Sequence, residues 1–397
     1  MDEPQPGEDQ TDTAQILDIT QTDTAPIYIG IDTNGLIGTG KTKTVYSCIE
    51  TEDENNKLFT LPDDTTLDKL CIAKIDINKI ILKKYSKEQE IVQEIVHYYI
   101  KNPQDFNNII INHNIEIWEN FISEYNDDEK YIDNPALYFE DELNEQIDKI
   151  KKEIELQNLF FDKHLAPKIY EDRFDEDTKM YYILEEKCGS PLLTYITIKT
   201  NQTKDNFNKI VDLVTKIADT GYINVDIKHE NTCTKIEDGL LSEIIALDFD
   251  TKFFIEFDLT NEEIKKQGKI FMLTLFIAYL AKKNIVFEKD IVVKHLDYDK
   301  IKDMLTFFAG NPELCAKEMH PIFMLWYYII SKDVNKFSCS DIPLDTIEAL
   351  TTRIYKFYIF PTKAGGSRKS RRPRNPRNPR NPRNLENKLY LFRIITI

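Results

Sequence analysis

Hydrophobic residues follow two different spacings along this chain. Short apolar runs rich in β-branched and aromatic residues predict strands at 27–31, 45–49, 70–75, 168–174 and 179–185. Apolar residues at helical spacing predict helices at 86–100 and 141–163 and, after Pro191, at 205–220, 262–283, 299–310, 319–331 and 343–358, with short strands around 232–236 and 244–248. Strands first and helices afterwards predict an α+β fold, with a small β-rich lobe and a larger helical lobe.

Changes in composition divide the chain into four segments. Residues 1–25 lack hydrophobic periodicity and contain Gln-Thr-Asp-Thr-Ala twice, so we expect a disordered acidic arm there. Residues 26–190 would form the first lobe, with an insertion rich in Asn, Asp and Glu at about 101–145, and residues 191–358 would form the second. Residues 359–397 form a basic tail that repeats Pro-Arg-Asn.

The net charge of −17 is distributed unevenly. Residues 361–397 carry eleven Lys or Arg against one acid, so the rest of the chain is more acidic than the total indicates. An acidic body argues against a nucleic-acid-binding fold. The tail differs, because a proline at every third residue keeps it extended and its arginines could contact the phosphates of nucleic acid. A solvated low-complexity tail and a nuclear-import signal fit the same residues.

The cysteines and the hydropathy of the chain indicate in which cellular compartment the protein would be found. The six cysteines are widely scattered and form no C-x-x-C pair, so we expect reduced thiols in a cytosolic setting. The N-terminus is acidic and polar, unlike a secretory signal. The longest apolar run, 270–281, has about half of the roughly 20 residues that a bilayer span requires. We therefore expect that run to be a buried helix, and we expect no membrane partner.

The strongest functional signal is an acid, a lysine and an amide at D-x-K-x-x-N spacing. Asp226, Lys228 and Asn231 occupy these positions, and Asp248 follows behind an apolar run. Phosphoryl transfer from a nucleotide needs such a set: one carboxylate accepts the proton of the attacking hydroxyl, and a lysine neutralises charge on the phosphoryl group. An amide and a second carboxylate hold the metal ions. Two acidic turns that flank a buried strand are the structural alternative.

Residues 221–233 resemble the catalytic loop of the protein-kinase-like superfamily, H-R-D-x-K-x-x-N. The run that ends at Asp248 resembles the strand that leads into the D-F-G metal site of the same superfamily. The resemblance implies a two-lobed kinase-like fold, ATP and Mg²⁺ as cofactors, and transfer of the γ-phosphate to a hydroxyl. It assigns Asp226 and Lys228 to catalysis, and Asn231 and Asp248 to metal binding.

One glycine-rich segment satisfies two different phosphate-binding patterns, and a hairpin that takes no part in binding would also fit it. It matches the Walker A pattern, in which Lys41 would open a helix. The β-branched and aromatic residues that follow favour a strand instead. In that interpretation Gly38, Gly40 and Val45 match the kinase glycine-rich loop, and Lys43 stands in place of the third glycine. This lysine removes a flexible point and adds a cation near the expected phosphates.

The resemblance also suggests a lysine and a glutamate that position the nucleotide. Residues 71–74 resemble the V-A-I-K strand, whose lysine, here Lys74, holds the α- and β-phosphates. Its carboxylate partner on a helix would be Glu153. Glu155, or Glu90 or Glu94 from the preceding predicted helix, could take that role instead.

Residues 181–189 resemble the kinase hinge, whose backbone reads the edge of adenine. The resemblance implies that Leu184 is the gatekeeper and that Glu185 and Cys188 lie beside the nucleotide. An edge strand that enters a loop would have the same pattern.

The resemblance extends from about residue 27 to about residue 280, with two departures. Asn224 and Val225 replace the His and Arg of H-R-D, so no basic pocket is expected for an activation-loop phosphate, and no A-P-E follows Asp250. We predict an ATP-dependent kinase that acts on Ser or Thr hydroxyls of protein substrates without activation-loop control. The missing A-P-E leaves open a small-molecule kinase on the same fold. A pseudokinase that serves as a binding module is the alternative from another class.

Heavy use of Asn, Ile and Lys, an abbreviated core and a basic tail resemble proteins of large nucleocytoplasmic DNA viruses. That resemblance implies a location in the cytoplasm or nucleus of a host cell, or packaging in the virion. The tail would then contact nucleic acid or other virion components.

Overall fold

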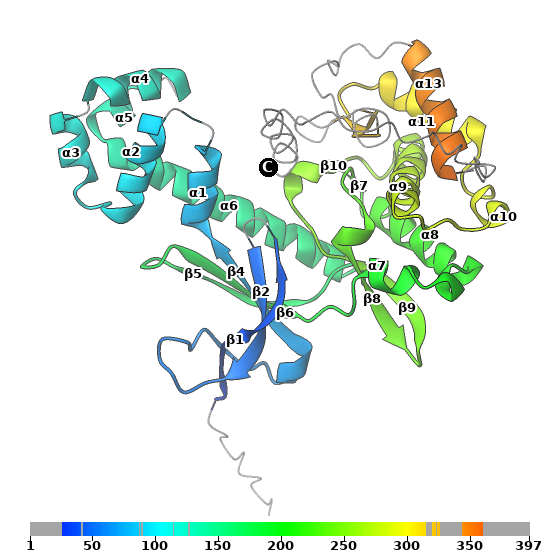
Figure 1. The fold of residues 1–397 in the computed structure, drawn as a ribbon, viewed down its shortest axis with the longest axis horizontal. Coiled ribbons are helices and arrows are strands. Elements are labelled where there is room, and N and C mark those ends of the chain that lie inside the picture. The colour runs from blue at the N-terminus through cyan, green and yellow to red at the C-terminus, as the bar shows by residue number, and fades with distance from the viewer. Residues whose placement is uncertain are drawn as a thin grey trace, which may run out of the picture.

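The computed structural model describes residues 26–40, 43–86, 88, 90–113, 115–125, 128–314, 320–322, 324–325 and 344–359. The predicted acidic arm, the basic tail beyond residue 359 and most of the helix predicted at 319–331 lie outside them. Within them an N-terminal antiparallel sheet is followed by a mostly helical region (Figure 1). The predicted α+β class is confirmed at this level.

Six strands form the N-terminal sheet in the order β3-β1-β2-β4-β6-β5, and every neighbouring pair is antiparallel. Their bounds are β1 Tyr28–Thr39, β2 Lys43–Glu50, β3 Phe59–Thr60, β4 Leu70–Asp76, β5 Ile169–Asp175 and β6 Met180–Glu186. Strand β4 is central and mostly buried, as its continuous apolar run predicts. It joins the β1–β2 hairpin to β6, which comes much later in the chain.

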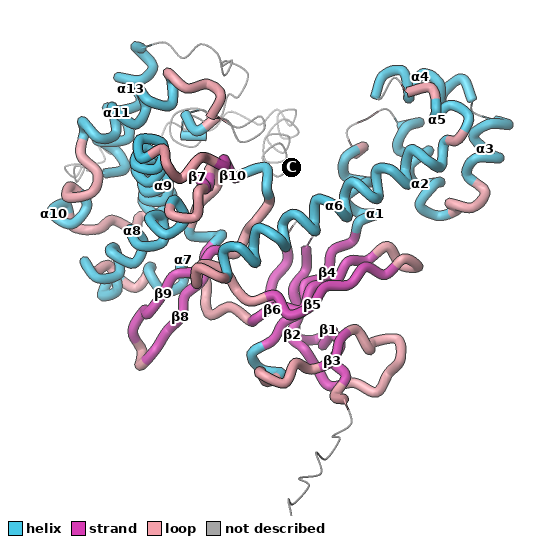
Figure 2. The backbone as a smooth tube through the Cα atoms, turned by 180° about the vertical axis from the view of Figure 1, so that it is seen from behind, coloured by secondary structure: helices cyan, strands magenta, loops and turns pink. Residues whose placement is uncertain are grey.

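Helix α6, Pro135–Phe161, lies across one face of the sheet (Figures 1 and 2). It runs from the helices that precede it in the chain to the helical region that follows the sheet. Side chains alternate between the two faces along β4 and β6. On the α6 face, Ala73 and Ile183 belong to the same hydrophobic cluster as Ile154 of the helix. At the C-terminal end of α6, Phe160 belongs instead to the core of the helical region. The helix therefore links the two cores.

The segment predicted as an insertion is itself helical. Five helices precede α6: α1 Ile77–Lys84, α2 Glu90–Lys101, α3 Phe106–His113, α4 Ile115–Tyr125 and α5 Lys130–Asp133. Aromatic side chains pack them against α6. The rings of Trp118 and Phe106 are fully buried and lie 5.9 Å and 5.5 Å from the ring of Phe139 of α6. The indole N–H of Trp118 donates to the carbonyl of Tyr131 at 2.7 Å.

The helical region combines α-helices with two short strand pairs. The helices are α7 Leu192–Ile196, α8 Lys204–Ala218, α9 Glu262–Lys282, α10 Lys289–Val292, α11 Tyr298–Ala309 and α13 Leu344–Ile354. The strand pairs are β7 Tyr222–Asn224 with β10 Phe254–Glu256, and β8 Thr232–Glu237 with β9 Leu240–Ala246.

Helix α9 lies at the centre of this region and contacts α8 and α11. Its side chains Phe271, Leu275 and Phe276 are fully buried, which confirms the expectation of a buried helix for the long apolar run. Among the residues described, none of the helices combines the length and apolar character that a membrane crossing needs.

Candidate active site

The predicted catalytic loop follows strand β7, which pairs with β10. Val225 and Ile227 are 0% and 1% exposed and belong to the core of the helical region. Asp226 lies between these two core residues in the turn that follows β7, and the backbone of Lys228 is extended. The loop ends in a 3₁₀ turn that brings Asn231 back beside Asp226.

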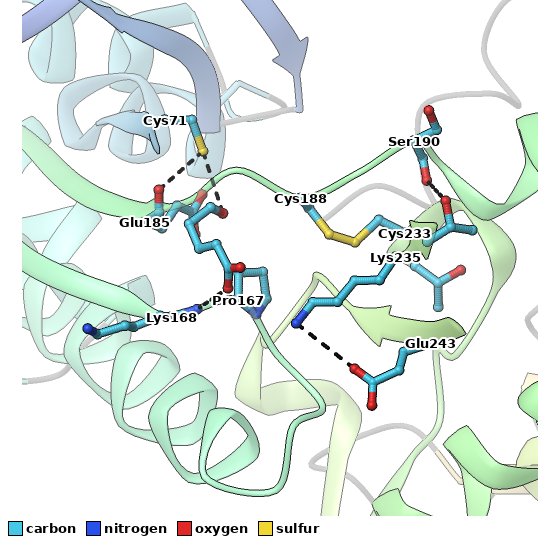
Figure 3. The surroundings of a disulfide bond; sticks show 12 residues. Cys71, Pro167, Lys168, Glu185, Cys188, Ser190, Cys233, Lys235 and Glu243 are labelled. Atoms are coloured by element: carbon cyan, nitrogen blue, oxygen red, sulfur yellow. Dashed lines mark hydrogen bonds and ion pairs between the residues drawn. A yellow bond between two sulfur atoms is a disulfide. The ribbon is translucent and has the colours of Figure 1, made fainter. Parts of the chain in front are cut away.

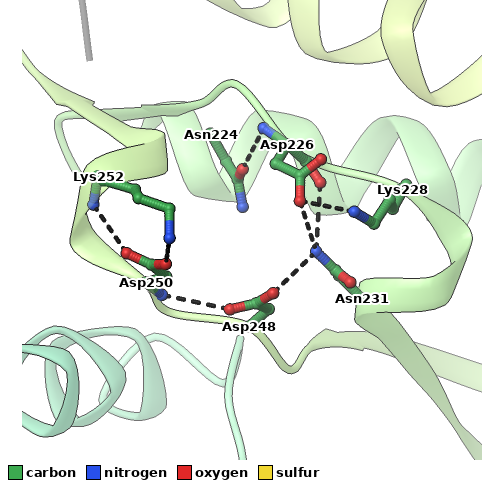
Figure 4. A network of polar contacts seen from close by, with 7 residues as sticks. All are labelled: Asn224, Asp226, Lys228, Asn231, Asp248, Asp250 and Lys252. Atoms are coloured by element: carbon green, nitrogen blue, oxygen red, sulfur yellow. Dashed lines mark hydrogen bonds and ion pairs between the residues drawn. The ribbon is translucent and has the colours of Figure 1, made fainter. Parts of the chain in front are cut away.

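Four of the predicted site residues meet in one polar network, shown in Figure 4. Lys228 Nζ donates to Asp226 Oδ2 at 2.6 Å. Asn231 Nδ2 lies 3.2 Å from Asp226 Oδ2 and 3.3 Å from Asp248 Oδ2, so the amide bridges the two acids. Asp226 is only 5% exposed, and its backbone N–H donates to Asn224 Oδ1 at 2.9 Å.

Asp248 is fixed by contacts on both sides of it in the chain. The N–H of Leu247 donates to the carbonyl of Asn231 at 3.0 Å, which ties the end of β9 to the catalytic loop. Phe249 is 4% exposed, and its ring centroid lies 5.3 Å from that of Phe160 of α6. The position of Asp248 therefore depends on both the catalytic loop and α6.

The electrostatics of Asp226 suit a proton acceptor. Burial raises the pKa of Asp226, the ammonium of Lys228 opposes that rise, and the charge of Asp248 adds to it. A carboxylate with a raised pKa is a stronger base than an exposed one. The network could accept a hydroxyl proton at Asp226 and offset phosphoryl charge at Lys228.

Asp248 offers carboxylate oxygens that fit a magnesium ion, and Asn231 would offer its Oδ1 once the side-chain amide is turned over, because its Nδ2 faces both acids here. Mg²⁺ usually binds through one or two carboxylates and completes its shell with water and substrate phosphates. In the part of the chain that the structure describes, no three His, Cys, Asp or Glu side chains are grouped as metal ligands. One carboxylate and one amide fit a site that a magnesium ion would share with water and bound phosphates.

The glycine-rich segment forms a β-hairpin. Gly38 is the Cα partner of Val45 across β1 and β2, and the N–H of Gly40 donates to the carbonyl of Lys43 at 2.7 Å. Strand β2 begins at Lys43, where the Walker alternative requires a helix, so that alternative is wrong. Lys41 itself lies outside the described residues. The strand–loop–strand form that the kinase pattern predicts is present.

Lys74 does not join the network. Tyr182 and Leu184 belong to the core on the sheet face away from α6. Lys74 is the Cα partner of Tyr182, and its ammonium lies 5.9 Å from the centroid of that ring. The structure therefore corrects the expectation that Lys74 pairs with Glu153, which lies on the α6 side. The same register places Leu184, predicted as the gatekeeper, on the far face.

A different lysine, Lys43, extends along the α6 face. Its Nζ lies 3.1 Å from Glu185 Oε1. Gln157 of α6 donates from its amide to Glu185 Oε2 at 3.3 Å. The sequence indicates a cation at the third glycine position but not its partners, because strand register decides them.

Glu153 of α6 lies within electrostatic range of both the lysine and the acids. Burial raises the pKa of Glu153 to about 8, and the charges of Asp250 and Asp248 add to that rise. The charges of Lys43 and Lys252 oppose it. Lys252 forms an ion pair with Asp250.

The other glutamates considered as lysine partners do not share this position. Glu155 and Glu94 are exposed, and the side chain of Glu90 lies outside the described residues. Among these glutamates, Glu153 is the one coupled to a lysine near the site, and that lysine is Lys43 rather than Lys74.

The segment predicted as the hinge connects β6 to the helical region (Figure 3). Cys188 forms a disulfide with Cys233 of β8, with their Cα atoms 6.3 Å apart. The chain passes so close to β8 that a Cβ added to Gly189 would lie 2.0 Å from the carbonyl oxygen of Thr234. The expectation of reduced thiols is wrong for this pair, because the fold brings together residues 45 positions apart. The other described cysteines are free and buried: Cys48 and Cys71.

Neither the comparison with models of known protein families nor that with curated proteins gave a match. The interpretation of the site therefore depends on its geometry and chemistry.

Proposed function

We propose that this chain is an ATP-dependent kinase with a two-lobed, protein-kinase-like fold that transfers the γ-phosphate to Ser or Thr hydroxyls of proteins. The polar network carries the proposal. Asp248 follows Asn231 by 17 residues, yet the two side chains are in contact, and Asn231 also contacts Asp226. Phosphoryl transfer needs an acid, a cation and metal-binding oxygens at one place. Two acidic turns without a catalytic role would not need the amide and the lysine between them.

The position of each residue supports a distinct role. Asp226 would accept the proton of the acceptor hydroxyl. Lys228, 2.6 Å from Asp226, would neutralise charge on the phosphoryl group during transfer. Asn231 and Asp248 would hold Mg²⁺, which supplies positive charge to the phosphate oxygens.

The sheet would supply the remaining contacts to ATP. The β1–β2 hairpin, with Gly38 and Gly40, would cover the phosphates, and Val45 would lie beside the base. The backbone near Glu185 and Cys188 would contact the adenine edge. These assignments follow the kinase pattern and the position of the hairpin next to β4.

One observation favours a small-molecule acceptor as a second candidate. A 3₁₀ turn, Thr251–Phe253, and strand β10 occupy the short segment between Asp248 and α9. Since β10 pairs with β7, this segment stays close to the catalytic loop. This short segment offers little surface on which a peptide substrate could dock. A small compound with a hydroxyl group needs less docking surface than a peptide does.

The basic tail calls for a separate proposal. Its regularly spaced arginines would contact phosphates of nucleic acid, in a host cell or a virion, independently of the kinase reaction.

Incubation with ATP labelled at the γ-phosphate, Mg²⁺ and an undialysed cell extract tests the proposed function, with Asp226→Asn as the control. Label on Ser or Thr of proteins that disappears with the variant supports a protein kinase. Label only in small molecules supports the second candidate. A rise in melting temperature with Mg²⁺-ATP but no transfer indicates a pseudokinase. If the protein shows no transfer and no thermal shift, the proposal is rejected.

A further inference from the structure

The side chain of Lys43 runs along the α6 face of strand β4. Lys43 is the Cα partner of Ile75 at one end of β4, and Glu185 is the Cα partner of Cys71 near the other end. The Lys43 ammonium nevertheless lies 3.1 Å from the Glu185 carboxylate. The lysine must therefore extend along the sheet, past Ala73, toward Glu185.

The Lys43 ammonium is restrained but still reaches solvent. Burial alone would lower the pKa of Lys43, but the charge of Glu185 and its hydrogen bond outweigh burial, so the pKa is raised and the lysine stays charged. The Lys43 side chain is 34% exposed, against 10% for Glu185. A charged group in this position can exchange a carboxylate partner for a phosphate.

Glu153 connects this lysine to the proposed metal site. The charges of Asp248 and Lys43 both act on Glu153, and Gln157, one helical turn further along α6, contacts the Glu185 partner of Lys43. Kinase chemistry requires such an arrangement: a lysine at the phosphates, a carboxylate on a helix beside it, and a metal-binding acid nearby.

We propose that Lys43, rather than Lys74, is the lysine that positions the ATP phosphates, with Glu185 as its ion-pair partner and the carboxyl group of Glu153 nearby. This inference rests on the proposed function. Lys43 begins the strand that follows the glycine-rich loop, so its backbone adjoins the element that would cover the phosphates. Lys252, the other cation near Glu153, is paired with Asp250.

The test compares Lys43→Met, Lys74→Met and the double variant Lys43→Met/Ala73→Lys with the wild type. Ala73→Lys introduces a lysine where the Lys43 side chain passes. The measurements are kcat and KM for Mg²⁺-ATP, from the loss of the γ-label, together with the melting temperature. Lys43→Met should lower kcat/KM by about 10²-fold or more, and Lys74→Met by less than about twofold. The kcat/KM of the double variant should be at least about tenfold higher than that of Lys43→Met.

Each outcome decides for or against the inference. The inference is overturned if the wild type is active and Lys74→Met lowers kcat/KM as much as Lys43→Met does. It is also overturned if Lys43→Met melts early but keeps its KM and kcat, since the lysine would then be structural. If the double variant does not fold, Lys43→Arg replaces it: retained Mg²⁺-ATP stabilisation supports the inference and its loss overturns it. A wild type that neither binds nor turns over Mg²⁺-ATP rejects the proposed function, and this inference with it.

Discussion

Glu153 should make the free energy of unfolding fall as the pH rises. Burial, reinforced by the charges of Asp250 and Asp248, raises the pKa of Glu153 from 4.5 to about 8 in the folded chain. The unfolded chain releases the same proton near its ordinary pKa, so between these values the folded state binds more protons. The stability that protonated Glu153 contributes is therefore complete below the unfolded pKa and is lost as the pH rises through the folded one.

The size of the effect follows from the shift in the Glu153 pKa. One pKa unit corresponds to about 1.36 kcal/mol, which is also the largest change in unfolding free energy per pH unit that one proton can cause. Between about pH 5 and about pH 8 the wild type should lose about 3 kcal/mol through this residue. Glu153→Gln has nearly the shape of the protonated side chain and no proton to release, so it should lack this loss.

Urea denaturation of the nucleotide-free protein at constant ionic strength measures this difference. Glu155→Gln is the matched control, because Glu155 is exposed on the same helix and its replacement removes the same formal charge. The stability of Glu153→Gln relative to wild type should rise by about 3 kcal/mol from about pH 5 to about pH 8, while Glu155→Gln follows the wild type. Parallel curves for wild type and Glu153→Gln would refute the placement of Glu153 among these acids.

Two further predictions concern the nucleotide and its regulation. Asp248→Ala should lose the rise in melting temperature that Mg²⁺-ATP gives the wild type, worth about 2.7 kcal/mol at about 100 times Kd; an equal rise in the variant contradicts the metal assignment. Phosphatase-treated protein, Thr251→Ala and Thr260→Ala should each keep the wild-type rate, because Val225 is 0% exposed and cannot pair with a phosphate. A fall of about tenfold, equivalent to about 1.4 kcal/mol, would show that another residue receives a phosphate.

The parts of the fold that were predictable are those whose pattern is local. Strands β4 and β6 have apolar runs of their own, and α9 has a long buried one, so each was evident in the sequence. Helices α3 to α5 are short and separated by polar residues. Trp118 and Phe106 gain their burial from Phe139 of α6, a contact that no short window of sequence contains. Helix α1 was not predicted, although Asp76 caps its N-terminus, and α6 begins at Pro135 rather than at the predicted residue 141.

In the candidate site, too, the contacts set by local spacing were predictable and those set by strand register were not. Asp226, Lys228 and Asn231 lie within six positions, so their spacing nearly determines their contacts. Lys74 matches a motif, but strand alternation decides which face it occupies, and a shift of one residue reverses that face. The register of β4 with β6 places Lys74 beside Tyr182.

Near the segment predicted as the hinge, two interactions join residues that are far apart in the chain. The Cys188–Cys233 disulfide depends on how the segment after β6 passes β8. The ion pair of Lys43 with Glu185 depends on the order of three strands in the sheet. Neither follows from the spacing of the residues in the chain.

In the proposed phosphoryl-transfer site, Asp226 accepts the proton of the acceptor hydroxyl. The decisive measurement is the rate at which the γ-label leaves ATP, to protein, small molecule or water, with wild type and Asp226→Asn compared at saturating Mg²⁺-ATP. Asparagine has the shape of aspartate but cannot accept the proton. The rate should therefore fall by about 10²- to 10⁴-fold, while the Kd for Mg²⁺-ATP changes by less than about twofold. Equal rates in the two proteins, or a loss of rate matched by a loss of binding, would contradict the claim and make Asp226 a structural residue.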